Sequence, residues 1–362
     1  MSATSAPYPG VRRVAVAAIA EYPECIDVRS PAEFALDRVP RAANHPVLDD
    51  AERARIGTLH AASAFEARKA GAAVVARNIA AMIESAFVNR PRDWRPLVYC
   101  WRGGQRSRAL VQVLQEIGWR AAQLEGGYRA YRRHVVAELA RLPQRLRYIV
   151  ICGLTGSGKS RLLAALAAAG AQTLDLEGIA RHRGSVLGGM PGEEQPSQKL
   201  FESGLLDALS RLDPARPVFV ESESRRIGAV QMPDALLEAM RAGRALTLVT
   251  PREARVALLQ DEYAHFFAAP DAVGACLEPL VELHGKAKIA RWEALAAQRD
   301  WEALIGELLD EHYDPIYTRS LKRNFAAEMR VIEARSADAA AFAALAREVL
   351  AGIDEEEISE TR

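Results

Sequence analysis

The chain has 362 residues, of which 49% are hydrophobic, and its 47 Lys and Arg balance its 47 Asp and Glu. This length exceeds one ordinary hydrophobic core and predicts two domains. The four cysteines stand far apart without a CxxC pair, which excludes a disulfide scaffold and a cysteine-rich zinc site. We find no signal-peptide pattern and no apolar run long enough to cross a bilayer, so we expect a cytoplasmic protein without a membrane partner.

Charge is divided unevenly along the sequence. Residues 1–147 hold 23 Lys and Arg against 14 Asp and Glu, and the remainder hold 24 against 33. A basic half suits a polyanion such as nucleic acid, but arginine-rich helix faces also occur as solvated surface. Charge alone leaves both interpretations open.

The first half alternates short apolar runs with helical patterns. We expect strands over residues 14–19, 25–28, 96–99 and 121–124, and this rhythm predicts a parallel sheet covered by helices. Cys100 directly follows the strand over 96–99. Ligand sites form at the carboxyl ends of strands in such sheets, so Cys100 lies at a candidate site.

The residues after Cys100 form a loop suited to an anion. Arg102, two glycines, Arg106 and Ser107 lead into a helix expected over 108–117. Backbone N–H groups and the helix N-terminus should converge on the sulfur. With Arg102 and Arg106 they would favour the thiolate and hold an oxyanion beside it. We therefore predict Cys100, Arg102 and Arg106 as catalytic residues.

Cys100 has an alternative interpretation as a small apolar residue packed at a strand end. This is how we interpret the other three cysteines, Cys25, Cys152 and Cys276. The two glycines and two arginines that follow Cys100 favour a nucleophile or a group carrier instead.

Four segments, in order along the chain, resemble the signatures of a rhodanese domain. They are Asp27–Phe34, Val39–Asn44, the loop of Cys100, and Leu124–Tyr128. Rhodaneses carry sulfur as a cysteine persulfide. Five residues separate Cys100 from Arg106, a longer loop than in many rhodaneses and similar to those of arsenate reductases and dual-specificity phosphatases. A larger substituent, such as selenium or a phosphate-linked group, would fit it.

The second half begins with an apolar strand expected over 147–152, a glycine-rich loop over 153–160 and a helix over 161–169. This order of strand, loop and helix distinguishes a phosphate-binding loop (P-loop) from a chance match. Its backbone N–H groups should hold a di- or triphosphate, while Lys159 neutralises charge and Ser160 holds Mg²⁺. The predicted phosphate-binding residues are Gly153, Thr155, Gly156, Ser157, Gly158, Lys159 and Ser160.

Acidic residues at the ends of two later apolar segments are candidates for binding a metal or the substrate. They are Asp175, Glu177, Glu221 and Glu223. Neither segment shows the apolar run followed by Asp that is typical of an ATPase, and the same residues could be caps or solvated charges. We therefore predict phosphate binding, leave ATP hydrolysis open, and predict no metal other than Mg²⁺.

A basic loop with neither helix nor strand pattern is expected over 177–185, where it could contact RNA phosphates or line a cleft. From about residue 233 onward we expect mostly helix, with one further strand over 246–249. The candidate RNA-binding residues are Arg181, Arg183, Arg225 and Arg226.

The whole pattern resembles the tRNA 2-selenouridine synthase family. The resemblance rests on the rhodanese signatures followed by a further set of segments, namely Gly153–Ser160, Asp175–Glu177, His182–Ser185, Glu221–Gly228, Leu283–Gly285 and His312–Pro315. It implies an α/β fold: a rhodanese-like parallel-sheet domain over 1–140, then a P-loop NTPase-like α/β domain over 141–362 with a helical C-terminal part.

The family's activity implies a transferase acting on the wobble 2-thiouridine in the anticodon arm of tRNA. A geranyl group from geranyl diphosphate would alkylate the sulfur, and selenium from selenophosphate would then replace the S-geranyl group. The P-loop would bind the diphosphate. Cys100 would handle selenium, either as a perselenide or by attacking selenophosphate, and the residues leave this choice open. No obligate protein partner is implied.

Two other functions are compatible with the same motifs. One is a Cys100-dependent phosphatase fused to an ATP-using kinase of small molecules or RNA. The other is a nucleotide-switched module that passes a persulfide to a separate enzyme.

Overall fold

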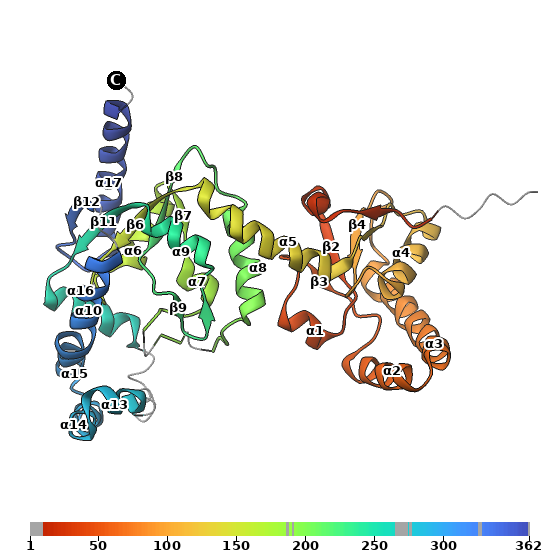
Figure 1. Cartoon of the computed structure of the whole chain (residues 1–362), viewed down its shortest axis with the longest axis horizontal. Helices are drawn as coiled ribbons and strands as arrows, with labels where there is room; N and C mark the ends of the chain where they lie inside the picture. Colours follow the sequence, from red (N-terminus) through yellow and green to blue (C-terminus); the bar gives the residue numbers. More distant parts are fainter. Residues whose placement is uncertain are drawn as a thin grey trace, which may run out of the picture. The chain divides into compact units, whose positions relative to one another are not determined.

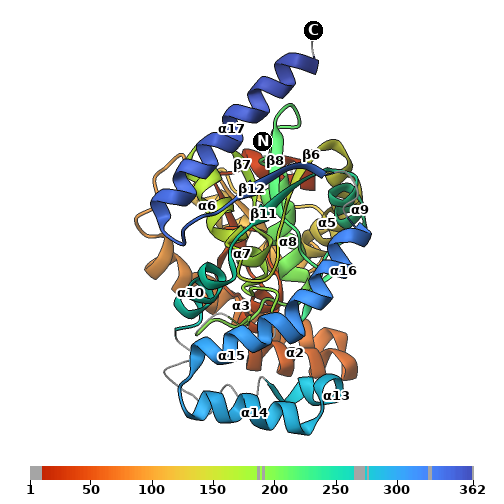
Figure 2. The same cartoon turned by 90° about the vertical axis from the view of Figure 1, so that its left-hand side faces the viewer.

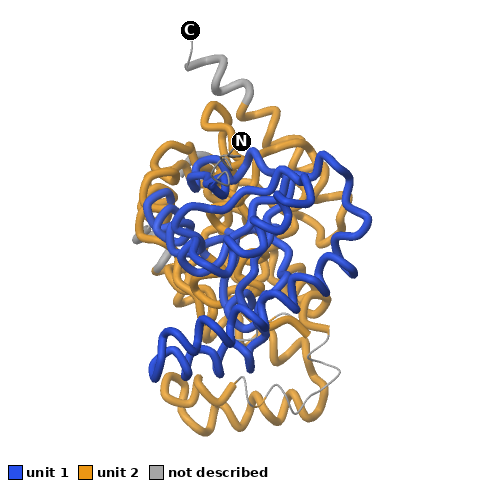
Figure 3. The backbone as a smooth tube through the Cα atoms, turned by 90° about the vertical axis from the view of Figure 1, so that its right-hand side faces the viewer, with its two compact units in different colours: residues 1–138, 202–204 blue, residues 139–201, 205–362 orange. Residues whose placement is uncertain are grey.

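The computed structural model describes residues 10–185, 188–189, 192–264, 274, 277–324 and 328–360. The chain forms two compact units, residues 1–138 with 202–204 and residues 139–201 with 205–362 (Figures 1 and 3). Helix α5 (Gly127–Arg141) runs across the boundary expected after residue 140, and that boundary stays a prediction. Cys276 lies outside the described residues.

Unit 1 is built on a five-stranded sheet whose strand order is β1-β5-β4-β2-β3, and every pairing in it is parallel. The strands are β1 (Arg13–Val14), β2 (Glu24–Asp27), β3 (Ala43–Asn44), β4 (Pro96–Tyr99) and β5 (Ala122–Leu124). The predicted parallel sheet is thus confirmed, and β4 lies at its centre and ends directly before Cys100.

The strand expected over 14–19 is wrong beyond Val14. Residues Val16–Glu21 form a 3₁₀-helix instead. The physical reason is the partner, because β1 lies at the sheet edge and β5 is only three residues long. After Leu124 the chain turns into Gly126 and Gly127, so no backbone remains for a longer strand to pair with.

Helices of unit 1 pack their apolar side chains against this sheet. Ile26 of β2 and Val98 of β4 share one core with Leu110 and Leu114 of α4. The α-helices before α5 are α1 (Pro31–Leu36), α2 (Asp50–Ala62), α3 (Ala64–Met82) and α4 (Gln105–Ile117). Helix α4 begins three residues earlier than expected, which brings its N-terminus next to the Cys100 loop.

One stretch of unit 1 corrects the expectation that no run could cross a bilayer. The helical stretch Ala64–Phe87, α3 with its π-helical extension, is long and apolar enough by length and composition: an 18-residue window in it has a mean hydropathy of 1.2, and 33% of that window is buried. Its Ile79, Met82 and Phe87 are buried in the core shared with β2 and β4. We therefore interpret it as a core helix. Cytoplasmic localisation stays a prediction.

Unit 2 holds a second parallel sheet, with the order β12-β11-β6-β8-β7. Its strands are β6 (Arg147–Cys152), β7 (Gln172–Leu174), β8 (Pro217–Glu221), β11 (Arg244–Val249) and β12 (Glu328–Glu333). The strand that feeds the P-loop, β6, is central. The sequence did not reveal β12 because it is an edge strand beyond a long helical region, where Ile332 is buried but Val331 is exposed.

The helices of unit 2 cover this sheet and extend from it (Figure 2). In that view α17 lies beside α6, and the two share a core through Leu162, Leu166, Phe342 and Val349. The helices are α6 (Lys159–Ala168), α7 (Leu176–Ala180), α8 (Gln198–Leu209), α9 (Asp234–Arg241), α10 (Arg252–Glu262), α13 (Val281–His284), α14 (Lys286–Ala297), α15 (Trp301–Leu308), α16 (Asp314–Asn324) and α17 (Ala339–Glu360). A short hairpin joins β9 (Arg226–Ile227) to β10 (Val230–Gln231).

The loop expected over 177–185 is wrong in its first part, because α7 occupies residues 176–180. Asp175 caps this helix, since its carboxylate accepts a hydrogen bond from Gly178 N at 2.7 Å. A side-chain cap of this kind stabilises a helix too short to show a clear periodicity in the sequence.

Candidate functional site

The P-loop connects the end of β6 to the start of α6, as predicted. Gly156 and Gly158 have φ values of +74° and +85°, which glycine adopts at little cost. A Cβ atom on Gly158 would stand 2.4 Å from the Phe342 ring, and one on Gly156 would stand 2.7 Å from Leu259. The loop therefore needs these glycines both for its turn and for its close packing under α10 and α17.

Two contacts hold the loop from within unit 2. Lys159 Nζ donates to the carbonyl oxygens of Gly153 and Leu154 at 3.2 and 3.4 Å, folding the ammonium group over its own loop. Arg255 Nε donates to the Thr155 carbonyl at 2.9 Å, and its other nitrogens form a bidentate ion pair with Asp314 at 2.6 and 2.9 Å. The P-loop conformation is thus set partly by α10 and α16.

Three of the four predicted acidic residues gather beside the P-loop. Ligand oxygens of Glu177, Glu221 and Glu223 all lie within 4.8 Å of one another. Ser160 Oγ lies 3.0 Å from Glu177 Oε2 and 3.2 Å from Glu221 Oε2. Glu221 ends strand β8, Glu223 lies in the segment directly after it, and Glu177 is on α7, so elements far apart in sequence meet at one point.

Burial raises the pKa of all three carboxyl groups, and repulsion within the cluster adds to the shifts of Glu177 and Glu221. Burial raises the pKa of Glu177 to about 7, with a further contribution from the charge of Glu223 and an opposing one from Lys159. Burial, followed by repulsion from Glu177 and Glu223, raises the pKa of Glu221 well above its usual range. Such a cluster favours either bound protons or a bound cation.

Asp175 does not join this cluster. Its carboxylate caps α7, which is the alternative role that the sequence left open for these residues, although the residue does line the cavity beside the P-loop. The signal for the cap is its position directly after a strand and three residues before Gly178.

The cavity beside the P-loop has a volume of about 240 Å³. Its lining combines polar and charged residues with Leu259, Tyr263 and Tyr317. Lys159 Nζ lies 5.7 Å from the centre of the Tyr317 ring. Lys159 and Arg183 could contact an anionic group here and the apolar residues a hydrocarbon, whereas the acidic lining residues would need protons or a cation beside such a group.

Of the four predicted RNA-binding arginines, Arg183 lines this cavity and stands 5.4 Å over the Tyr263 ring. Arg181 pairs with Glu193, and Arg225 pairs with Asp234. Arg226 donates to the Gly228 carbonyl within the hairpin of β9 and β10. The structure does not bring the four together at the cavity, and their contact with RNA stays a prediction.

The loop of Cys100 lies at the carboxyl end of β4. The Cys100 side chain is buried, and its Sγ accepts hydrogen bonds from Gly104 N at 3.3 Å and Ser107 Oγ at 3.2 Å. Gly127, at φ +56°, lets the segment after β5 come against this loop, because a Cβ there would stand 2.3 Å from the Cys100 carbonyl oxygen. The glycines of the rhodanese signature therefore serve close backbone packing.

Neither predicted catalytic arginine is a hydrogen-bond donor to the sulfur among the described contacts. Arg106 forms an ion pair with Glu33 at 2.8 Å. Arg102 lines a separate open cavity together with Arg13 and Arg133. In the described part of unit 1, both hydrogen bonds at the sulfur come from neutral groups. The roles of Arg102 and Arg106 stay predictions.

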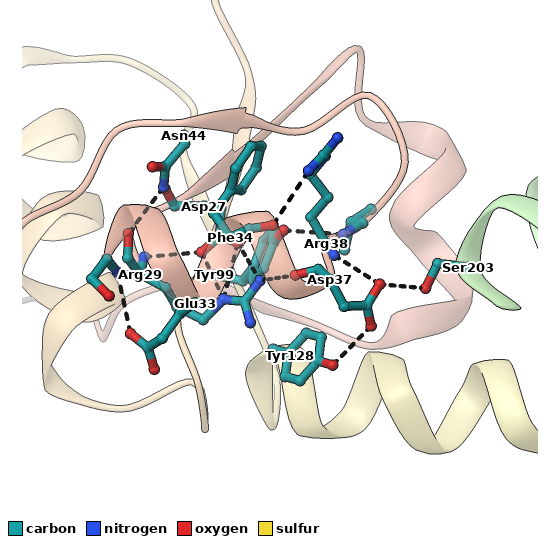
Figure 4. A network of polar contacts seen from close by, with 12 residues as sticks. Asp27, Arg29, Glu33, Phe34, Asp37, Arg38, Asn44, Tyr99, Tyr128 and Ser203 are labelled. Carbon is teal, nitrogen blue, oxygen red and sulfur yellow. Dashed lines mark hydrogen bonds and ion pairs between the residues drawn. The ribbon is translucent and has the colours of Figure 1, made fainter. Parts of the chain in front are cut away.

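A buried polar network joins residues of the rhodanese signature segments (Figure 4). Arg29 pairs with Asp27 at 2.6 Å and stacks 4.1 Å from the centre of the Tyr128 ring. Asp37 accepts hydrogen bonds from Tyr128 Oη and Ser203 Oγ, both at 2.8 Å. Because Tyr128 N also donates to the Cys100 carbonyl at 2.8 Å, these signature residues fix the backbone beneath the sulfur.

Comparisons with known proteins agree with a chain in which the Cys100 loop is followed by a P-loop. Residues 15–134 match the family model of the rhodanese-like domain, and residues 146–271 match that of the tRNA 2-selenouridine synthase AAA domain. A tRNA 2-selenouridine synthase of Chromohalobacter salexigens is 33% identical over 330 residues, which cover 83% of this chain and 88% of that protein. The chain belongs to the tRNA 2-selenouridine synthase family.

Two other similar proteins match a smaller share of this chain. A tRNA 2-selenouridine synthase of Nitrosomonas europaea is 36% identical over 250 residues, covering 66% of this chain but only 63% of its own length, less than two thirds. The solved structure of a rhodanese-related protein from Thermoplasma volcanium is 20% identical, covers 34% of this chain and 92% of its own, and has a TM-score of 0.23.

Membership of the tRNA 2-selenouridine synthase family confirms the predicted fold, a rhodanese domain followed by a P-loop domain with a helical C-terminal part. Sequence analysis missed three residues that contact these sites. Gln123 lies under the Cys100 loop, and Arg255 with Asp314 holds the P-loop. The sequence marked Asp314 only as part of a family segment, and nothing in the pattern around Gln123 distinguished it from a core position.

Proposed function

We propose that this chain is a transferase that converts the wobble 2-thiouridine of tRNA to 2-selenouridine. The names of its relatives and the family of its P-loop domain support this proposal. The observation that carries it is the pairing of a buried thiol in a rhodanese loop with a phosphate cradle on one chain. The substrate is the anticodon arm of tRNA.

The P-loop cavity would bind geranyl diphosphate for the first step. Backbone N–H groups and Lys159 would hold the diphosphate, while Leu259, Tyr263 and Tyr317 would contact the hydrocarbon. The thiouridine sulfur attacks the first geranyl carbon, the bond from that carbon to the diphosphate oxygen breaks, and pyrophosphate leaves while N3 of the base loses its proton to solvent. Lys159 stabilises the charge that develops on this leaving group.

The same cavity fits a divalent cation such as Mg²⁺. Glu177, Glu221 and Glu223 offer three carboxylates, and Ser160 adds a hydroxyl. Glu221 Oε1 is buried without a hydrogen-bond partner among the described residues, which is costly unless another ligand satisfies it. A cation bound there would supply further positive charge near the diphosphate.

Cys100 would release selenium from selenophosphate in the second step. Attack of its thiolate on phosphorus breaks the phosphorus–selenium bond, frees selenide and leaves S-phosphocysteine, with no change in oxidation state. A perselenide on Cys100 needs a two-electron oxidation in addition, so we favour attack on phosphorus. Selenide then replaces the geranyl thiolate, a better leaving group than sulfide, at C2 of the base.

Mass spectrometry of nucleosides tests this function. Purified chain, 2-thiouridine tRNA, geranyl diphosphate and Mg²⁺ are expected to give a geranyl mass, and added selenophosphate is expected to replace it with selenium. Unchanged tRNA at both stages would contradict the proposal. ATP turnover or phosphate-ester cleavage in its place would favour the fused phosphatase and kinase, and persulfide transfer to a second enzyme would favour the carrier.

A further inference from the structure

A buried glutamine lies directly behind the reactive sulfur of unit 1. Gln123 is on β5, the neighbour of β4, and its side chain is 1% exposed. Its Nε2 donates to Ser107 Oγ at 2.8 Å and to the Gly104 carbonyl at 3.0 Å. Gln123 therefore contacts both residues that donate to Cys100 Sγ.

Hydrogen-bond accounting fixes the direction of the Ser107 proton. Ser107 Oγ lies within reach of two acceptors, Cys100 Sγ at 3.2 Å and the Gly104 carbonyl at 3.4 Å. That carbonyl already accepts from Gln123 Nε2 at 3.0 Å and from Arg108 N at 3.1 Å, which uses both lone pairs of the oxygen. The Ser107 hydroxyl therefore donates its proton to Cys100 Sγ.

The reverse orientation of the Gln123 amide is unfavourable. It would place the amide oxygen against the Gly104 carbonyl, where two acceptors repel, and it would draw the Ser107 proton away from the sulfur. In the orientation present, the amide oxygen is buried without a hydrogen-bond partner among the described residues. The orientation present thus leaves the Gln123 amide oxygen without a hydrogen bond, while the amide nitrogen donates two.

We propose that Gln123 is a positioning residue that acts through Ser107 to aim a hydroxyl donor at Cys100 and so stabilise its thiolate. The nearest loop arginines do not replace this donor, because Arg106 pairs with Glu33 and Arg102 lines a separate cavity. This inference rests on Cys100 being the reactive thiol of the proposed function.

The test is the rate of Cys100 alkylation by iodoacetamide between pH 5 and 10, read by peptide mass spectrometry on the full chain without tRNA. Gln123→Met removes both donated bonds at similar volume. We expect about tenfold slower alkylation at pH 7 and a pH profile displaced upward by about one unit, as for loss of one bond to a charged group. Ser107→Ala is expected to match it.

The double variant separates positioning from a general structural effect. If Gln123 acts through Ser107, Gln123→Met in a Ser107→Ala background slows alkylation no further. The control is Gln115→Met, which removes a 2.9 Å bond to the Ala121 carbonyl and leaves the sulfur network intact, so its profile stays that of the parent chain.

Two outcomes would overturn the proposal: parental alkylation by folded Gln123→Met, or effects of the two single variants that multiply in the double. If Gln123→Met does not fold, Gln123→Asn keeps the amide one methylene short of Ser107 and carries the same expectation. Because the readout is thiol chemistry, it stays separate from the outcome of the tRNA assay.

Discussion

The two loops of this protein have the same architecture and different chemistry. Each follows the central strand of a five-stranded parallel sheet and leads into a helix, β4 into α4 and β6 into α6. The first aims neutral donors at a buried sulfur, while the second places a lysine near a cluster of three carboxyl groups with raised pKa values. Fold position therefore predicts where a site lies, and the side-chain partners decide which charge it accepts.

The arginines near the two loops also show that side-chain partners are not predicted by position in the sequence. The sequence pattern placed Arg102 and Arg106 beside the sulfur, but Arg106 has a carboxylate partner 73 residues away in the chain. The P-loop has the opposite arrangement, because its buried Arg255 contacts a loop carbonyl from helix α10. Which arginine contacts which loop therefore depends on the tertiary structure, because carboxylate partners from other elements hold some of these side chains.

The largest expected effect is the loss of anion binding at the second loop alone. Lys159→Ala removes the ammonium group from a cavity whose other charges are mainly acidic. We expect diphosphate affinity, measured by calorimetry with geranyl diphosphate and Mg²⁺, to fall by about 100-fold or more. Cys100→Ala is the matched control and should bind as the parent does. Equal loss in both variants would contradict the separation of the two sites.

The next effect concerns the backbone packing of the first loop. Gly127→Ala places a Cβ 2.3 Å from the Cys100 carbonyl at a positive φ, so we expect unit 1 to lose about 3 kcal/mol of unfolding free energy. Gly104→Ala meets open space and should cost much less. Urea unfolding followed by tryptophan fluorescence measures both, and equal midpoints would show that the close approach is unimportant.

A smaller effect is expected at the support of the second loop. Asp314→Asn weakens the ion pair of Arg255, which is 5% exposed, and should cost about 2 kcal/mol with weaker diphosphate binding. Asp310→Asn breaks the exposed pair with Arg252 and should cost about 0.5 kcal/mol or less. Similar costs for both in thermal unfolding would mean that burial of the pair does not matter.

The smallest effect is the pH dependence of cation binding. The folded-state pKa of Glu177 is about 7, above its ordinary value of 4.5, so in the cation-free protein this group destabilises the fold as pH rises through that window. A cation replaces the proton, and its affinity should therefore rise with pH up to about 7, by at most about tenfold per unit.

Manganese titrations at pH 6 and 8 measure this dependence. Glu177→Gln should weaken this dependence and leave a remainder, because the pKa values of Glu221 and Glu223 are raised as well. Glu238→Gln, at an exposed position of α9 outside the cavity, should leave the dependence unchanged. A dependence as steep in Glu177→Gln as in the parent chain would show that Glu177 is not one of the titrating groups.

The sequence predicted the parts of each site that follow from local pattern. Strand, loop and helix around Cys100 and Lys159 were placed correctly because apolar runs, glycines and helix starts are local signals. The partners were not, since Gln123 under Cys100 and Asp314 at the P-loop are brought in by neighbouring elements. The edge strands of both sheets were also not predicted correctly: β1 is shorter than expected, and β12 was not expected at all.

The central claim is that the two loops perform separate steps on one tRNA. Nucleoside mass spectrometry of the Lys159→Ala and Cys100→Ala variants, supplied with geranyl diphosphate, Mg²⁺ and selenophosphate, tests it most directly. We predict that Lys159→Ala leaves 2-thiouridine unchanged, whereas Cys100→Ala accumulates the S-geranyl nucleoside without selenium. Equal loss of both products in two folded variants, or selenium incorporation by Cys100→Ala, would contradict the account.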